Sequence, residues 1–206
     1  MGFDKLLAPL GDLDVLSHTL LRFFECPQVT EIVLVCPAVR FDALLLPDEV
    51  KAQVKRVDGG AERHHSVMAG LQALTGTNDY VAIHDGARPL VTVDAVTLCL
   101  EQAMATGAAT LARPATETIK RASADQEVES SVSRDNLWFM ETPQIFANEK
   151  ILQAYQEVEA QKELVTDEVS ALQLIGQLTS LVSSPCFNPK ITYPTDLELA
   201  HKFLQP

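Results

Sequence analysis

Short apolar runs alternate with amphipathic stretches along this chain, and no other feature of the sequence constrains its fold as strongly. The apolar runs of strand length cover residues 32–36, 80–83 and 108–112. Helical periodicity covers residues 15–26, 63–74, 93–106, 149–162, 167–175 and 196–204. Strands that alternate with helices are typical of βα units around a mostly parallel sheet. We therefore expect an α/β fold in which helices flank such a sheet.

Size and charge narrow the class of protein. A chain of 206 residues with 47% hydrophobic residues can bury a core of its own, which predicts a single domain over residues 1–206. A formal net charge of −12 argues against binding to nucleic acids or anionic membranes, because both require a basic surface. Neither an apolar run of membrane-spanning length nor a signal-peptide pattern occurs, so we expect a cytoplasmic protein. Free thiols are expected at the widely spaced Cys26, Cys36, Cys99 and Cys186.

Residues 115–135 differ from the rest of the chain because they are polar and β-branched, without helical periodicity. Two alternating pieces, at residues 118–120 and 131–133, predict a β-hairpin that projects from the domain. An isolated hairpin is marginally stable and usually needs a partner surface. We therefore expect a homodimer formed through this hairpin arm.

Capping signals mark several of the predicted helices. Thr92 and Thr166 directly precede helical stretches and are candidate N-caps. Gly107 and Gly176 stand where helices should end, because glycine adopts the left-handed conformation of a C-cap.

Residues 81–89 (VAIHDGARP) place an acid and a base directly after a predicted strand. Asp85 offers oxygen ligands to a hard cation, Arg88 offers a planar fork to a phosphate, and Gly86 allows a ligand to approach the backbone. This motif indicates metal-assisted phosphate chemistry. The alternative is an Asp–Arg pair that closes a turn at Pro89 without a catalytic role.

A second candidate loop, residues 57–67 (VDGGAERHHSV), leads through Gly59 and Gly60 into a predicted helix. Paired glycines expose backbone amides, and the N-terminus of a helix favours anions. Ser66 adds a hydroxyl donor and Arg63 adds positive charge. An ordinary strand-to-helix turn explains the glycines equally well. Neither GxGxxG nor GxxxxGKS/T occurs, so a dinucleotide fingerprint and a P-loop are not predicted.

Two other arrangements carry less weight. Ser66, His84 and Asp85 are the residue types of a hydrolase triad, but no GxSxG motif occurs, and neighbours in a strand point to opposite faces. Lys190 lies between two prolines that could hold it in place, although a solvated lysine is the commoner case.

Taken together, these segments resemble the 2-C-methyl-D-erythritol 4-phosphate cytidylyltransferases of the nonmevalonate isoprenoid pathway. The motifs follow the order and similar spacing of that family, from about residue 5 to the end of the chain. They are DGGAERHHSVMAGL (58–71), VAIHDGARP (81–89), ETIK (117–120), SRDNLW (133–138), TPQIF (142–146), TDEVSAL (166–172) and NPKIT (188–192). The resemblance implies a Rossmann-like nucleotidyltransferase fold. It also implies in-line attack of the polyol phosphate on the α-phosphate of CTP, with release of pyrophosphate.

The resemblance further implies roles for individual residues. The expected catalytic group is Lys5, Lys190 and Asp85, with Asp85 also next to Mg²⁺ or another divalent cation. Contacts to the methylerythritol phosphate are expected from Arg88, Arg134, Thr142 and Thr166, and Arg134 and Thr142 would reach the substrate of the neighbouring subunit. Contacts to the nucleotide are expected from Gly59, Gly60, Ala61, Arg63, Ser66 and Gly86. Ala61 stands where many members have Asp, which alters a contact to the ribose or the base.

The chain departs from the family at its start. Family members have a strand and an AAGxGxRM loop before the lysine that Lys5 matches, whereas this sequence begins at Met1, where that loop would end. We expect an internal Met or a fragment, with roughly two dozen further residues in the natural protein. One alternative is a catalytically impaired relative without the nucleotide loop. Another is a ribitol 5-phosphate cytidylyltransferase, which shares most of these motifs.

Overall fold

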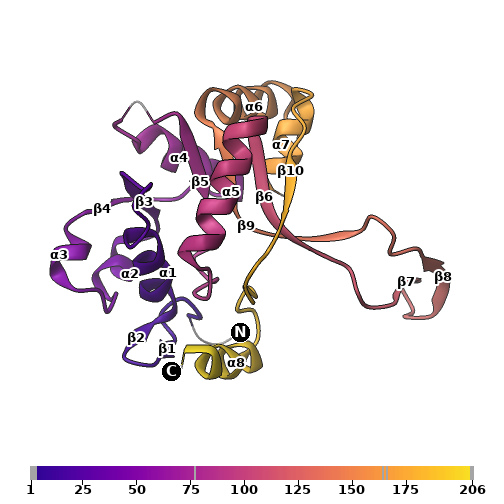
Figure 1. Ribbon diagram of the computed structural model, residues 1–206, viewed down its shortest axis with the longest axis horizontal. Coiled ribbons are helices and arrows are strands. Elements are labelled where there is room, and N and C mark those ends of the chain that lie inside the picture. The colour runs from indigo at the N-terminus through magenta and orange to yellow at the C-terminus, as the bar shows by residue number, and fades with distance from the viewer. Residues whose placement is uncertain (1–3, 77, 164, 166, 205–206) are drawn as a thin grey trace.

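A computed structural model describes residues 4–76, 78–163, 165 and 167–204. Helices pack around a central sheet, and a hairpin projects from it, as the sequence predicts (Figure 1). The helices are α1 (Val15–Phe24), α2 (Ala38–Asp42), α3 (Asp48–Lys51), α4 (Arg63–Ala73), α5 (Val93–Thr106), α6 (Asn148–Gln161), α7 (Glu168–Leu174) and α8 (Pro194–Leu204). The strands are β1 (Pro9–Leu10), β2 (Leu13–Asp14), β3 (Ile32–Val35), β4 (Val54–Val57), β5 (Tyr80–Ile83), β6 (Ala108–Pro114), β7 (Ile119–Ala122), β8 (Val128–Val132), β9 (Trp138–Ala147) and β10 (Ser180–Ser183).

Four strands form the central sheet in the order β10-β6-β9-β5. β10 runs parallel to β6, whereas β9 runs antiparallel to both β6 and β5. β5, β6 and β10 therefore share one direction, and β9 alone opposes it. The sequence prediction misses β9, because its buried part contains Glu141, Thr142 and Gln144 in place of a continuous apolar run.

Neighbouring residues of β9 pack against helices on opposite faces of the sheet. Ile145 packs with Cys99 of α5, whereas Phe146 packs with Ile151 and Tyr155 of α6. This period of two is the ordinary geometry of a strand. Full burial of each such large apolar side chain contributes about 1.5–3 kcal/mol, so both cores hold β9 in place.

β3 and β4 form a separate parallel pair, with Ile32 opposite Val54. Within the described residues this pair makes no ladder to the four-stranded sheet, and β5 pairs with β9 alone. Because each strand keeps one open edge there, β3 and β5 are half-buried and Ala82 is exposed. Both strands are therefore less buried than their apolar sequences suggest.

β7 and β8 form an antiparallel hairpin, with Ile119 opposite Val132, that extends away from the helical body (Figure 1). Most of its side chains are exposed. The predicted hairpin arm is thus confirmed as an element of the fold. Its role in dimer formation stays a prediction.

Capping residues set both ends of α5 where the sequence predicts them. The side chain of Thr92 accepts a hydrogen bond from Ala95 N at the start of α5, and Gly107 ends this helix with φ 87°. The N-cap of α7 is Asp167, so the prediction of Thr166 is one residue early. Thr166 itself lies outside the described residues.

The expected free thiols are found, and Cys26, Cys36 and Cys99 are buried. Among the helices of the described ranges, none has both the length and the apolar character needed to cross a membrane.

Candidate active site

The predicted acid and base meet at the end of β5. Asp85 lies two residues beyond this strand, and its Oδ2 atom accepts a hydrogen bond from Arg88 Nε at 3.1 Å. Lys190, on the segment that precedes α8, brings its Nζ within 3.3 Å of the same oxygen. A turn at Pro89 explains the contact of Arg88 with Asp85. It does not explain the contact of Lys190 with Asp85, because Lys190 lies far away in the sequence.

The two cations determine the charge of Asp85. Burial alone would raise the pKa of its carboxyl group, but Lys190 and Arg88 outweigh burial and bring this pKa below its ordinary value. Asp85 is therefore an anion at neutral pH. Both ion pairs use Oδ2.

Arg88 is buried and bonded to the protein at each end of its fork. Its Nη1 donates to the carbonyl of Asn188 at 2.8 Å, and its Nη2 makes a longer contact of 3.4 Å with the carbonyl of Met140. Arg88 thereby ties the β5 loop to β9 and to the segment of Lys190. The geometry gives Arg88 a positioning role, and its expected contact with a substrate phosphate stays a prediction.

Thr142 is buried on β9, with its hydroxyl turned towards the β5 loop. Its Oγ1 accepts a hydrogen bond from Asp85 N at 3.0 Å and lies 3.0 Å from His84 Nδ1. Burial lowers the pKa of His84 to about 4, so its ring is neutral at pH 7. The Thr142 hydroxyl then donates to Nδ1, and His84 Nε2 donates to the carbonyl of Arg88 at 3.3 Å. These bonds fix the backbone that carries Asp85.

Asn188 is a site residue that the sequence prediction misses. It is buried, and its Nδ2 donates to the carbonyl of Thr142 at 2.8 Å while its own carbonyl accepts from Arg88. Asn188 therefore locks the segment that carries Lys190 onto β9. The only sequence signal was its place beside Pro189 in the NPKIT motif, which does not distinguish a buried amide from a turn residue.

Gly86 lies tightly against α1. An added Cβ would come within 2.7 Å of Leu16 Cδ1 and 3.7 Å of Leu6 Cδ2, and the Gly86 carbonyl accepts from Thr19 Oγ1 at 2.9 Å. Packing therefore explains this glycine without any ligand. The contact with Leu6 also brings the segment of Lys5 beside this loop, and Lys5 is half-buried there.

The glycine loop, residues 58–62, packs onto the first turn of α4. An added Cβ at Gly60 would lie 2.3 Å from His65 Cβ, so this position requires glycine. At Gly59 an added Cβ would lie 2.8 Å from Ser66 Oγ and would displace this hydroxyl. Gly60 N donates to Ser66 Oγ at 3.1 Å, which shows that Ser66 holds the loop in shape. Ala61 is exposed at its tip.

The structure does not bring every predicted residue to Asp85. Arg63 directs its fork to Glu168, whereas Arg134 is exposed on the arm and donates to the carbonyl of Thr116. Thr166 lies outside the described residues. The predicted contacts of these residues with substrates stay predictions.

The residues around Asp85 fit a magnesium ion that is held mainly by its substrate. The described ranges contain no group of three or more His, Cys, Asp or Glu residues able to hold a metal by themselves. Mg²⁺ is commonly bound through one or two carboxylates together with substrate phosphates. The single carboxylate of Asp85 suits this mode of binding.

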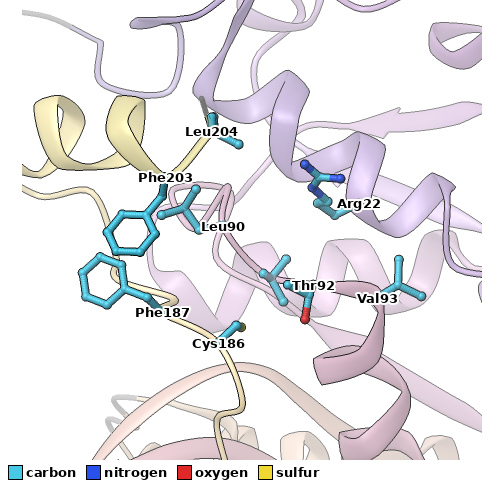
Figure 2. A pocket seen from close by; sticks show the side chains of 9 residues that line it. Arg22, Leu90, Thr92, Val93, Cys186, Phe187, Phe203 and Leu204 are labelled. Atoms are coloured by element: carbon cyan, nitrogen blue, oxygen red, sulfur yellow. The ribbon is translucent and has the colours of Figure 1, made fainter. Parts of the chain in front are cut away.

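A pocket of about 330 Å³ lies between α1, α8, the residues that follow the β5 loop and the residues that precede Asn188 (Figure 2). Its lining is mainly apolar and includes a stacked pair, Phe187 and Phe203, with ring centroids 4.7 Å apart. None of the predicted site residues lines it. We therefore place the candidate active site at Asp85 and not in this pocket.

Solved structures identify the class of protein. A 2-C-methyl-D-erythritol 4-phosphate cytidylyltransferase from Francisella tularensis matches with a TM-score of 0.86 and 28% identity, over 98% of this chain and 94% of that chain. Its counterpart from Thermus thermophilus gives a TM-score of 0.84 and 27% identity, over 97% and 92%. The fold and the cluster at the end of β5 define this chain as an α/β protein of the nucleotidyltransferase class.

The family is defined by the sequence comparisons. The model of the 2-C-methyl-D-erythritol 4-phosphate cytidylyltransferase (IspD) family matches residues 1–206, and this chain belongs to that family. A relative of that name from Shewanella amazonensis is 37% identical over 205 residues, which is 98% of this chain and 85% of the relative. Another, from Halalkalibacterium halodurans, is 37% identical over 206 residues, or 98% and 90%. The resemblance inferred from the motifs is confirmed.

Proposed function

We propose that this chain transfers the cytidylyl group of CTP to 2-C-methyl-D-erythritol 4-phosphate. Membership of the family over residues 1–206 supports this function. The structural observation that carries it is the cluster of Asp85, Arg88 and Lys190, because it joins two separate family motifs at one strand end.

The reaction needs no covalent enzyme intermediate. A phosphate oxygen of the polyol phosphate attacks the α-phosphorus of CTP, the bond from this phosphorus to the bridging oxygen breaks, and pyrophosphate leaves with the bonding electrons. Both reactants are anions, so catalysis depends on positioning them and on offsetting their charge. Lys190 suits this task, because its side chain is 47% exposed and an ammonium group keeps further donors beside the one turned to Asp85.

The roles of the remaining predicted residues follow from the resemblance to the family. Lys5 joins Lys190 and Asp85 as the catalytic group. Gly59, Gly60, Ala61, Arg63, Ser66 and Gly86 form the nucleotide side, and Arg88, Arg134, Thr142 and Thr166 form the side of the methylerythritol phosphate. When bound at Asp85, Mg²⁺ or another divalent cation would offset charge on the phosphates.

We also propose a homodimer in which the hairpin arm carries Arg134 towards the site of the second subunit. The exposed faces of β7 and β8 support this arrangement, since an unpartnered hairpin is marginally stable. The cytoplasmic location stays a prediction from the sequence.

Pyrophosphate release from CTP tests the proposed function. We expect release with 2-C-methyl-D-erythritol 4-phosphate and Mg²⁺, and much slower release with ribitol 5-phosphate. Preference for ribitol 5-phosphate would assign the chain to the related activity. No release with either substrate, combined with no detectable CTP binding, would contradict an enzymatic role.

A further inference from the structure

A completely buried carboxylate lies beside the nucleotide side of the site. Glu168, the first residue of α7, has 0% exposure. Its Oε1 and Oε2 accept hydrogen bonds from Arg63 Nη1 at 2.5 Å and Nη2 at 2.8 Å. The hydroxyl of Tyr155, which is itself buried in α6, donates to Oε1 at 2.9 Å. We call these three side chains the Glu168 clamp.

The Glu168 clamp joins elements that are far apart in the sequence. Arg63 is the first residue of α4 and follows the glycine loop directly. Glu168 begins α7, whose N-cap Asp167 accepts a hydrogen bond from Gln144 of β9 at 3.3 Å. A bidentate Arg–carboxylate pair fixes orientation as well as distance, because the guanidinium fork is planar. The clamp therefore sets where the glycine loop lies relative to β9.

Stability alone explains this arrangement poorly. Taking a carboxylate out of water carries a large desolvation cost, and well-packed apolar residues of similar volume are often as stabilising or more so. Burial would lower the pKa of Arg63, yet Glu168 outweighs burial and raises this pKa, with a smaller contribution in the same direction from Asp85. The Arg63 guanidinium is thus paired chiefly with Glu168.

We propose that Glu168 is a positioning residue, which holds Arg63 and the glycine loop in the orientation that receives CTP opposite Asp85. This inference rests on the proposed function. Tyr155 supports Glu168 by fixing Oε1, and neither residue needs to touch the nucleotide. Loss of the clamp should weaken CTP binding more than it slows the chemical step, because it loosens a binding loop and leaves the Asp85 cluster intact.

Glu168→Gln and Tyr155→Phe test the clamp in the full chain. We expect Glu168→Gln to raise the KM for CTP about tenfold or more, the ratio that corresponds to one lost charge-assisted hydrogen bond, while kcat changes much less. Tyr155→Phe removes only a hydroxyl group and should raise the same KM by a few-fold. Arg63→Lys keeps the charge but not the fork, and should behave like Glu168→Gln.

Hydrogen exchange separates positioning from general stability and does not depend on turnover. In Glu168→Gln the amides of residues 59–66 should exchange about tenfold faster, with those of β6 and α5 unchanged. Glu25→Gln breaks the exposed ion pair of Arg22 with Glu25 and serves as the control, with wild-type exchange and KM. If amides throughout Glu168→Gln exchanged faster, or if exchange of residues 59–66 were unchanged, the positioning role of Glu168 would be wrong. A wild-type chain that neither releases pyrophosphate nor binds CTP would overturn the proposed function, whereas hydrogen exchange would still show whether the Glu168 clamp holds the glycine loop.

Discussion

At the scale of single residues, the candidate site depends on one carboxylate oxygen. Asp85 Oδ2 meets both Arg88 and Lys190, but these two cations differ in exposure. Arg88 is buried and its fork is engaged by backbone carbonyls, whereas Lys190 is about half exposed. Lys190 is therefore the cation best placed to offset the negative charge that develops on a bound phosphate.

Lys190→Ala should lower turnover about 100-fold or more, because removal of one such charged donor costs about 2.7–4 kcal/mol in the transition state. Pyrophosphate release at saturating CTP measures this effect. Lys202→Ala, in the last turn of α8, serves as the control and should keep wild-type turnover. Wild-type turnover in Lys190→Ala would exclude its catalytic role.

His84 makes folding stability depend on pH. Burial lowers the pKa of His84 to about 4 in the folded chain, below its ordinary 6.5. Between these values the unfolded chain binds a proton that folded His84 does not, so the free energy of unfolding should fall as pH drops from 6.5 towards 4. The slope from this group should approach about 1.4 kcal/mol per pH unit at most.

Urea unfolding at about pH 7 and about pH 5 measures this slope. His84→Gln should lose most of the difference between the two conditions, whereas His201→Gln, on α8, should retain it. Equal slopes in wild type and His84→Gln would show that other groups carry the pH dependence.

At the scale of elements, periodicity and capping predict the local structure well. The bounds of α5 and β5 agree with the sequence prediction, because Thr92 and Gly107 cap α5 and β5 is a continuous apolar run. The sequence does not predict β9, because this strand buries polar side chains that form hydrogen bonds with other segments. The sequence does not predict the Glu168 clamp for the same reason, since only tertiary contacts distinguish a buried Glu from an exposed Glu in the first turn of a helix.

The hairpin arm allows a test of subunit exchange. If Arg134 acts in the site of the second subunit, then Arg134→Ala and Lys190→Ala should each be impaired, and an equal mixture should regain activity. Half of the mixed dimers contain both variants, and each of these has one site with both residues intact. We therefore expect about one quarter of wild-type turnover after exchange of subunits.

Sedimentation should show a dimer for each variant and for the mixture. Arg121→Ala, on the same arm, is the matched control and should be active without mixing. If a mixture that has exchanged its subunits regained no activity, Arg134 would act in the site of its own subunit or in neither site.

At the scale of the whole molecule, an acidic chain has to bind two anionic reactants. The formal net charge is −12, so long-range forces oppose the approach of CTP. The Asp85 cluster counters this locally with Arg88 and Lys190. A divalent cation would reduce the mismatch further, since it arrives with the nucleotide and neutralises part of its charge. Binding of CTP should therefore depend strongly on Mg²⁺.

Thermal unfolding measures this dependence without turnover. A ligand at 100 times its Kd that binds only the folded chain adds about 2.7 kcal/mol to the free energy of unfolding. For a chain of this length, that should raise the Tm by roughly 5–10 °C. We expect this shift with CTP and Mg²⁺ together, and little or no shift with CTP and EDTA.

Asp85→Asn should remove most of the Mg²⁺-dependent shift, because the amide offers a cation a neutral oxygen in place of a carboxylate. Asp125→Asn, at the exposed turn of the arm, should keep the full shift. If CTP raised the Tm of the wild-type chain equally with and without Mg²⁺, nucleotide binding would not depend on the metal. An unchanged Mg²⁺-dependent shift in Asp85→Asn would place the cation elsewhere and leave Asp85 with the role of orienting Lys190.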